Sequence, residues 1–330
     1  MTDICIIGGS GFIGSAISHR LEGMGTPFSI VDQRPSPFYP NHHTLADITK
    51  PDTIAGQVKG SCIIHLAAVH RDDVRPLSRY DEVNVEGTRA LCREAEAAGI
   101  QRIVFASSVA VYGFAEPGTD ETGAVAPFND YGRTKAEGEV VLKEWQAADP
   151  ERRSLTIIRP TVVFGPGNRG NVYGLLRQIA SGRFVMIGAG KNRKSMAYVE
   201  NVADFFLYFT DAEPGVRIYN YIDGPDMQVD DLVRLTRREV LGRDNVGLRL
   251  PKPVGVLAGW MADGLRAVTG MRFPISRIRV KKFTENTAFT TALSNEHNFV
   301  PKVSLADGLK ATIDAEFLNP KPDQVTFETE

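Results

Sequence analysis

The sequence predicts an α/β fold in which helices flank a doubly wound parallel sheet. Short apolar runs alternate along the first half of the chain with stretches whose apolar residues recur at helical spacing. The apolar runs are continuous, as in parallel strands that are buried on both faces. Such an alternation of strand and helix favours a single sheet whose strands are joined by right-handed crossovers.

The expected elements follow one another from the first residues. Strands are expected at residues 4–7, 28–31, 62–66, 102–106 and 155–158, and helices between them at 14–23, 87–98 and from 131 onward. Beyond about residue 165 the pattern loosens, and helices are expected at 175–181, 230–241 and 305–317. A helix at 199–210 and a strand at 217–221 are expected to pack back onto the first half. The polar tail after Asn319 is expected to fray.

The composition argues against several classes of protein. The chain has 38 Lys and Arg and 40 Asp and Glu, so its net charge of −2 gives no general affinity for nucleic acid or for an anionic membrane. No apolar run approaches the roughly 20 residues that span a bilayer, so no membrane insertion is expected. Three cysteines without a C-x-x-C pair fit a reducing compartment, and we expect a cytoplasmic protein. The histidines show no metal spacing, so no metal site is expected.

The strongest local signal is the glycine-rich turn after the first expected strand. Gly8, Gly11 and Gly14, with Phe12 and Ile13 between the last two, lie where that strand ends and a helix begins. Missing side chains let backbone N–H groups approach a pyrophosphate, and the helix N-terminus adds positive potential. The turn therefore predicts a dinucleotide site.

A carboxylate ends the second expected strand. Asp32 lies about twenty residues beyond the turn, where it would accept hydrogen bonds from the adenosine ribose hydroxyls. Because it would repel a 2′-phosphate, it favours NAD over NADP. Arg34 follows closely and would either stack on the adenine or tolerate a phosphate, so NADP stays an alternative if the enzyme is a reductase.

A tyrosine and a lysine four residues apart predict the catalytic pair. Tyr131 and Lys135 share one helix face, and an ammonium beside a phenol lowers its pKa from about 10. The resulting phenolate would act as a general base on a substrate hydroxyl. Ser107 and Ser108 end a buried strand at the carboxyl edge of the sheet, where ligands bind, so a serine there would bond the reacting oxygen.

These motifs, in this order, resemble the extended short-chain dehydrogenase/reductase family in its nucleotide-sugar epimerase/dehydratase branch, over at least residues 4–317. The resemblance implies that Ser108 is the catalytic serine, Tyr131 the base and Lys135 the residue that binds the nicotinamide ribose. It adds further cofactor contacts: Asp47, Ile48, Leu66, Ala67, Ala68, His70, Asn84, Ser107, Pro160 and Thr161.

The resemblance also divides the chain into two domains. Residues 1–166 with about 196–224 would form a Rossmann-type NAD-binding domain. About 167–195 with 225–330 would form a smaller, mainly C-terminal domain for the substrate. A length of 330 residues suits two coupled domains.

The substrate implied by the resemblance is a UDP-sugar. Asn171 would meet the diphosphate, and Val172 would lie near the base. Arg193 and Lys194 would bind phosphate, as would Lys282 in a second basic stretch. Cations of this kind are what a pyrophosphate requires, although a basic solvated turn would look the same.

Two chemistries stay open at this point. The family's dehydratases carry Thr-Asp-Glu where this chain has Ser108-Val109-Ala110, which disfavours dehydration. The favoured activity is a C4 epimerase of a UDP-hexose or UDP-N-acetylhexosamine, with a transient 4-keto sugar and recycled NAD. The alternative is an NAD(P)H-dependent 4-reductase of a UDP-4-keto-6-deoxy-N-acetylhexosamine. A steroid or alcohol dehydrogenase and a non-catalytic NAD sensor are less favoured. The resemblance further implies a homodimer and a place in bacterial surface-polysaccharide synthesis.

Overall fold

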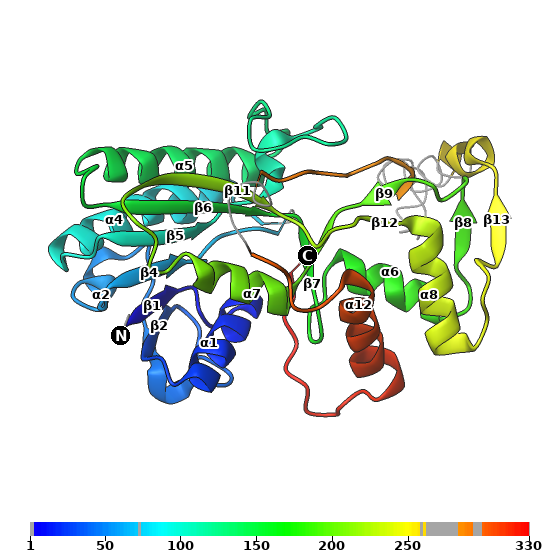
Figure 1. Ribbon diagram of the computed structural model, residues 1–330, viewed down its shortest axis with the longest axis horizontal. Helices are drawn as coiled ribbons and strands as arrows, with labels where there is room; N and C mark the ends of the chain where they lie inside the picture. Colours follow the sequence, from blue (N-terminus) through cyan, green and yellow to red (C-terminus); the bar gives the residue numbers. More distant parts are fainter. Residues whose placement is uncertain (1–2, 72–73, 258–259, 262–282, 293–298, 330) are drawn as a thin grey trace.

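The computed structural model describes residues 3–71, 74–257, 260–261, 283–292 and 299–329. Its centre is a parallel sheet with the strand order β3–β2–β1–β4–β5–β6–β11 (Figure 1). The strands are β1 (Ile4–Ile7), β2 (Phe28–Asp32), β3 (His43–Leu45), β4 (Cys62–His65), β5 (Arg102–Ala106), β6 (Ser154–Pro160) and β11 (Gly215–Tyr221). The predicted doubly wound parallel sheet is therefore confirmed. The strand order reverses beside β1, which is where such sheets bind ligands.

Helices cover both faces of this sheet. Helices α4 (Gly87–Ala97) and α5 (Asp130–Ala147) lie on one face, and α1 (Phe12–Met24) and α7 (Val199–Tyr208) lie on the other (Figure 1). Each face has its own apolar core, built on alternate side chains of the same strands. The short helices in this half of the chain are η1 (Pro40–His42), α2 (Pro51–Ile54), α3 (Ser78–Asp81), η2 (Glu82–Glu86) and η3 (Val109–Tyr112).

A smaller group of elements lies beyond the carboxyl edge of the sheet (Figure 1). It contains α6 (Asn171–Ala180), α8 (Val229–Leu241) and α12 (Leu305–Ile313), which continues as η4 (Asp314–Leu318). Three strand pairs join it: β7 (Val162–Phe164) with β10 (Met196–Tyr198), β8 (Val185–Ile187) with β13 (Leu248–Leu250), and β9 (Arg193–Lys194) with β12 (Met227–Gln228). The expected packing of 199–210 and 217–221 onto the first half is confirmed by α7 and β11. The proposed domain boundaries stay a prediction.

The C-terminal tail is the clearest departure from expectation. The prediction that it frays after Asn319 is wrong, because Phe327 exchanges backbone hydrogen bonds with the loop that follows β7. Its N–H donates to the Gly167 oxygen and its oxygen accepts from the Arg169 N–H, each at 2.9 Å. The Phe327 ring packs on Phe12 with the centroids 5.7 Å apart. The tail therefore reaches the first helical residue after the glycine turn.

Candidate active site

The glycine turn has the shape that a dinucleotide site needs. Gly8 adopts φ +80°, and a Cβ on it would lie 2.5 Å from the Ala67 backbone nitrogen. A Cβ on Gly14 would lie 2.5 Å from the Gly9 Cα, so strand and helix meet too closely for a side chain. Gly11 begins α1 with no side-chain cap, and the first turn of α1 has no acidic residue. The first N–H groups of α1, around Phe12, therefore lack a side-chain acceptor and suit a phosphate.

Asp32 is held against this turn. Its carboxylate accepts from the Ser10 N–H at 3.0 Å and from the Arg34 N–H at 2.9 Å. The Ser10 hydroxyl donates in turn to the Arg34 backbone oxygen at 2.8 Å. A carboxylate has lone pairs beyond these two, so Asp32 can also accept from ribose hydroxyls.

The expected loops below the cofactor also line this edge of the sheet. The Leu66 and Ala67 N–H groups donate to the Ile7 oxygen at 2.8 and 3.0 Å. These bonds hold the loop that leads to Ala68 beside the glycine turn. Pro160 ends β6, and the Thr161 N–H continues the sheet to the Tyr221 oxygen at 3.0 Å.

His70 follows the Ala67–Ala68 loop and stays exposed. Desolvation by the surrounding protein lowers the pKa of its imidazole, a hydrogen bond with the Ala68 backbone opposes this, and the charges of Lys135 and Arg34 lower the pKa further. The side chain therefore lies within the electrostatic field of the predicted site, beside residues expected to contact the cofactor.

Three predicted cofactor contacts have side chains that are engaged elsewhere. The Asp47 carboxylate accepts from the Thr49 N–H and hydroxyl, and so closes a turn. The Ile48 side chain is buried in the core. Asn84 uses both amide hydrogens, on the Val69 oxygen and the Thr134 hydroxyl, and accepts from the Val69 N–H at 2.7 Å. Asn84 thus joins the loop after β4 to helix α5, and this bridging was not anticipated.

Two of the predicted catalytic residues, Ser108 and Lys135, lie at the carboxyl edge of β5. Ser108 caps η3 and accepts from the Ala110 N–H at 3.2 Å, which leaves its hydroxyl hydrogen for a ligand. Asn129 caps α5 by accepting from the Gly132 N–H at 2.9 Å, and Tyr131 lies in the first turn of that helix. The Lys135 ammonium donates to the Ala106 backbone oxygen at 2.6 Å. This bond fixes the start of α5 against the end of β5.

Lys135 is almost completely buried. Burial lowers the pKa of its ammonium to about 7, although Glu139 opposes the shift. The nitrogen also lies 4.6 Å from the centroid of the Phe105 ring. A buried cation with one backbone acceptor and an aromatic face is well placed to meet an anion or hydroxyl that binds at the carboxyl edge of β5.

A buried ion pair behind the site was missed by the sequence analysis. Glu139 accepts from the Arg159 Nε at 2.8 Å and from its Nη2 at 2.6 Å, and both side chains are 3% exposed. Ser107 donates its hydroxyl to Glu139 at 2.6 Å, so that hydrogen is not available to a cofactor. Arg159 also donates to the Tyr112 hydroxyl at 2.7 Å. The signal was present, since charged residues on a buried strand and a buried helix face are rarely left unpaired.

The described substrate residues lie in two places: Arg193 and Lys194 form β9, and Asn171 and Val172 begin α6. Lys194 is half-buried and donates to the Glu285 oxygen at 2.7 Å, and burial lowers the pKa of its ammonium to about 8. Arg193 beside it is exposed and donates to the Asp226 oxygen. Asn171 is exposed at the start of α6, whereas the Val172 side chain is buried in the core and offers no contact to a base. Lys282 lies outside the described residues.

Residues 285–292 run from β9 to the loop after η3, which follows the predicted catalytic residue Ser108. Thr287 pairs with Lys194, and Phe289 pairs with Thr119 in the loop after η3. The Thr290 oxygen accepts from the Asn220 amide at 2.9 Å, at the end of β11. This segment crosses from β9 toward the catalytic side in Figure 1, so it links the two parts of the predicted site.

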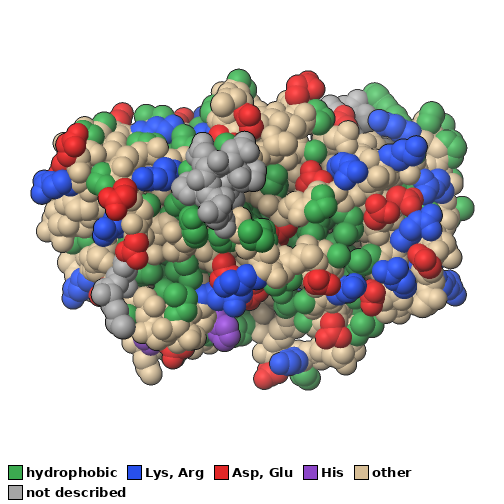
Figure 2. Space-filling model, viewed as in Figure 1, with side chains coloured by type: hydrophobic (Ala, Val, Ile, Leu, Met, Phe, Trp, Pro, Cys, Tyr) green, Lys and Arg blue, Asp and Glu red, His purple; other side chains and the backbone are tan. Residues whose placement is uncertain are grey.

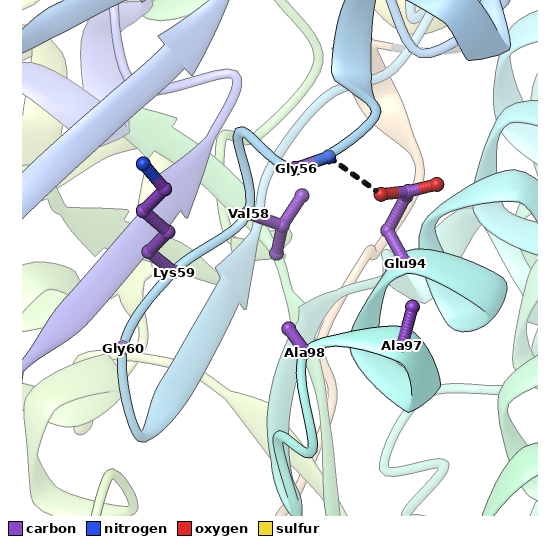
Figure 3. Close-up of a pocket in the computed structure, with 7 residues that line it drawn as sticks. All are labelled: Gly56, Val58, Lys59, Gly60, Glu94, Ala97 and Ala98. Carbon is purple, nitrogen blue, oxygen red and sulfur yellow. Dashed lines mark hydrogen bonds between the residues drawn. The ribbon is translucent and has the colours of Figure 1, made fainter.

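A hollow of about 390 Å³ lies elsewhere, between α4 and the loop before β4 (Figure 3). Glu94 accepts there from the Gly56 N–H at 3.1 Å, and Lys59 points away from it. Because the hollow adjoins the amino end of β4, it is not part of the site at the carboxyl edge.

Neither a cluster of metal ligands nor a membrane-spanning helix occurs among the described residues. Within this part of the chain, no His, Cys, Asp and Glu residues gather in threes to hold a metal ion. No helix among the described residues has both the length and the apolar character needed to cross a membrane.

Comparison with known proteins agrees with the geometry. The N-acetyl-alpha-D-glucosaminyl-diphospho-ditrans,octacis-undecaprenol 4-epimerase of Escherichia coli is 42% identical over 332 residues, which cover 99% of each chain. The UDP-N-acetylglucosamine 4-epimerase structure from Bacillus cereus is 15% identical with a TM-score of 0.75, and covers 99% of this chain and 100% of that one.

The structure of the Thermus thermophilus UDP-glucose 4-epimerase with NAD is 19% identical with a TM-score of 0.67, over 97% of this chain and 100% of that one. At such identities the two structures show a shared fold. The sequence also matches a family profile over residues 4–221, well over half of the chain. The resemblance inferred from the motifs is therefore confirmed, and the chain belongs to the NAD-dependent epimerase/dehydratase family.

Proposed function

We propose that this chain is an NAD-dependent C4 epimerase of an N-acetylhexosamine linked through a diphosphate. The observation that carries the proposal is the convergence of Ser108, the first turn of α5 and Lys135 at the carboxyl edge of β5. The relative at 42% identity is a 4-epimerase, and the two sequences align over nearly their whole lengths, which supports the same chemistry.

The residues present fit NAD. The turn at Gly8 and Gly14 has no room for side chains, and α1 begins there without an acidic residue, so it would hold the pyrophosphate. Asp32 would accept from the adenosine ribose. When bound, NAD supplies a reversible hydride acceptor, so that one site can oxidise and reduce C4. In this proposal, residues 1–166 with about 196–224 hold NAD, and the remaining residues hold the substrate.

The protein's own groups handle the proton. Tyr131 would take the proton of the C4 hydroxyl during oxidation and return it during reduction. The charge of Lys135 would favour the phenolate form of Tyr131, and the Ser108 hydroxyl would hydrogen-bond the same C4 oxygen. Because Tyr131 both takes the proton during oxidation and returns it during reduction, the reaction requires no second proton donor.

For the carrier of the sugar, we propose undecaprenyl diphosphate. The 42% identical relative acts on a sugar that this carrier holds, and buried Val172 offers no side-chain contact to a nucleotide base. UDP is the second candidate, favoured by the likeness of Asn171 and Lys194 to the diphosphate contacts of nucleotide-sugar epimerases. The homodimer and the cytoplasmic location stay predictions.

The experiment offers each substrate without added cofactor. Purified protein is incubated with N-acetylglucosaminyl-diphospho-undecaprenol in detergent and, separately, with UDP-N-acetylglucosamine, and the released sugar is identified. N-acetylgalactosamine from the lipid substrate alone supports the proposal, and from the nucleotide alone supports UDP as the carrier. Turnover that requires a 4-keto sugar and added NADH would establish the reductase instead. Tyr131→Phe should keep bound NAD and lose the reaction, and an active Tyr131→Phe protein would remove Tyr131 as the base.

A further inference from the structure

We propose that residues 324–329, the tail segment, keep NAD bound between turnovers, and that Phe327 is the positioning residue through which they act. The inference rests on the proposed function, because an epimerase that recycles its NAD must hold the cofactor while the oxidised sugar is in the site. The family profile ends at residue 221, so the tail segment lies outside it.

The tail segment lies against the loop that joins β7 to α6. Phe327 pairs there with Asn168, and its backbone exchanges two hydrogen bonds of 2.9 Å with Gly167 and Arg169. Two residues further on, the Thr329 hydroxyl donates to the Asn168 side-chain oxygen at 3.1 Å. Backbone and side-chain bonds therefore fix the segment on this loop at more than one point.

A buried carboxylate makes this loop a firm base. Glu316, in η4, accepts from the Gly167 N–H and from the Arg169 guanidinium, both at 2.6 Å, and its side chain is only 2% exposed. The Gln324 amide donates to the same carboxylate at 3.1 Å. Hydrogen bonds to an ionised acceptor are among the stronger ones in proteins. Glu316 thus holds both the loop and the start of the tail segment.

The Phe327 ring joins the two walls of the predicted NAD site. Its centroid lies 5.7 Å from that of Phe12 and 6.5 Å from that of Phe38, both within the range of aromatic contacts. Phe12 begins α1, whose first N–H groups suit the pyrophosphate. Phe38 belongs to the loop that follows Asp32, the predicted ribose acceptor. One ring therefore ties the pyrophosphate wall to the adenosine wall.

The path of the tail places this ring at the carboxyl edge of the sheet. In Figure 1 the tail, drawn in red, leaves the end of α12, turns at the lower edge of the molecule and runs back toward its middle. Lys321 and Asp323 in the turn are exposed, and Figure 2 shows charged side chains at this lower edge. The turn is solvated, so the contacts of the tail segment itself keep the ring in place.

These contacts oppose the release of a dinucleotide. When the two walls separate to let it leave, the Phe327 ring must lose at least one of its aromatic partners, which raises the barrier. The contacts of the tail segment described above do not include Ser108 or Lys135. The segment should therefore govern how long NAD stays, and leave the proton and hydride steps unchanged once NAD is bound.

The first test measures NAD release directly. Protein loaded with radiolabelled NAD is mixed with an excess of unlabelled NAD, and the label that stays on the protein is followed over time. Phe327→Ala should release NAD about fivefold faster than the parent protein. Phe299→Ala is the matched control, because it removes a partly buried ring whose centroid lies 5.0 Å from that of Phe205, among the residues around α7. The control should release NAD at the parent rate.

Two outcomes of this test would overturn the proposal. The first is a parent-like rate in Phe327→Ala, and the second is an equal acceleration in Phe327→Ala and Phe299→Ala, which would reflect general loosening of the fold. Phe327→Leu keeps apolar volume and the backbone pairing, so it should fold even if the alanine variant does not. It should release NAD at an intermediate rate, and a parent-like rate would equally count against the ring.

The second test asks whether Phe327 acts through Phe12. Phe12→Ala keeps the N–H groups of the first turn of α1 and removes the ring contact. Because the two rings share one contact, the double variant with Phe327→Ala should release NAD more slowly than the product of the two single accelerations predicts. Accelerations that multiply would show that the rings act independently, and would refute the contact as the cause.

Activity then separates retention from folding. In dilute solution without added NAD, Phe327→Ala should lose activity with time, and excess NAD should restore the parent kcat. Activity that NAD does not restore would overturn a role confined to retention. The two proposals also fail separately, because NAD release is measured without substrate. A negative epimerase assay leaves a faster release standing, whereas an active epimerase whose Phe327→Ala variant keeps its NAD overturns only the role of the tail segment.

Discussion

The buried pair of Glu139 and Arg159 offers the sharpest test of the packing behind the active site. Glu139→Gln keeps the shape of the side chain and removes its charge. The Arg159 guanidinium would then stay buried without a counter-charge, and it would keep only the Tyr112 hydroxyl and the single amide oxygen of the new side chain as acceptors. At present, burial opposes the charge of Arg159, but the hydrogen bonds and charge of Glu139 outweigh this and raise its pKa. Leaving such a cation unpaired costs about 3–5 kcal/mol of folding free energy.

Removing both charges should destabilise the fold less than removing one. Arg159→Met in the Glu139→Gln background no longer buries an uncompensated cation, and the Ser107 hydroxyl can still donate to the amide oxygen at position 139, so the double variant should lose less stability than Glu139→Gln alone. Urea denaturation of the parent, the two single variants and the double variant closes a double-mutant cycle. We expect a coupling free energy of about 2 kcal/mol or more between the two positions.

A control on the same helix separates burial from charge. Glu137 pairs with Arg133, but these side chains are 44% and 38% exposed. Glu137→Gln should cost less than about 1 kcal/mol, because exposed pairs are solvated and screened. If Glu139→Gln costs no more than Glu137→Gln, or if the two buried substitutions are additive within about 0.5 kcal/mol, the reasoning is refuted.

Three further predictions concern binding. Asp32→Ala should weaken NAD about tenfold and NADP much less in a calorimetric titration, because only NAD presents the ribose hydroxyl to the carboxylate, and equal losses would contradict that role. Lys194 should make kcat/KM fall as pH rises through about 8, since the ammonium loses its charge there, whereas Lys194→Arg should stay level, and parallel profiles would exclude Lys194 from the diphosphate site. Phe327→Ala should raise the dissociation rate of NAD about fivefold by removing the ring that packs on Phe12, and an unchanged rate would mean that the tail does not retain the cofactor.

Much of the larger half of the fold could be predicted because parallel strands leave a direct mark on a sequence. Strands β1 and β4 are buried on both faces, so every residue in them is apolar except His65, and their ends are evident. The glycine turn was equally legible, because close backbone approach at Gly8 and Gly14 tolerates no other residue. Here local physics alone determines the pattern.

Contacts between distant segments left no such mark. The tail after Asn319 is polar, and nothing near it in sequence predicts that Phe327 pairs with Gly167 and packs on Phe12. The partner of a backbone N–H is selected by the whole fold, whereas composition reports only the local cost of ordering. A polar segment that is anchored by long-range hydrogen bonds, as at Phe327, therefore looks disordered in the sequence.

The two adjacent serines show how far a motif can specify a site. Ser107 and Ser108 follow the same buried strand, and successive residues of an extended chain point to opposite sides. Ser107 therefore donates inward to Glu139, while Ser108 caps η3 at the carboxyl edge of β5. Lys135 and Glu139 are four residues apart on α5, so both side chains point from the helix toward the sheet. The lysine binds the end of β5, and the glutamate binds Arg159 of β6. Glu139 thus holds the strand ends on which Ser108 and Lys135 depend. Its loss should disturb the geometry of catalysis as well as stability.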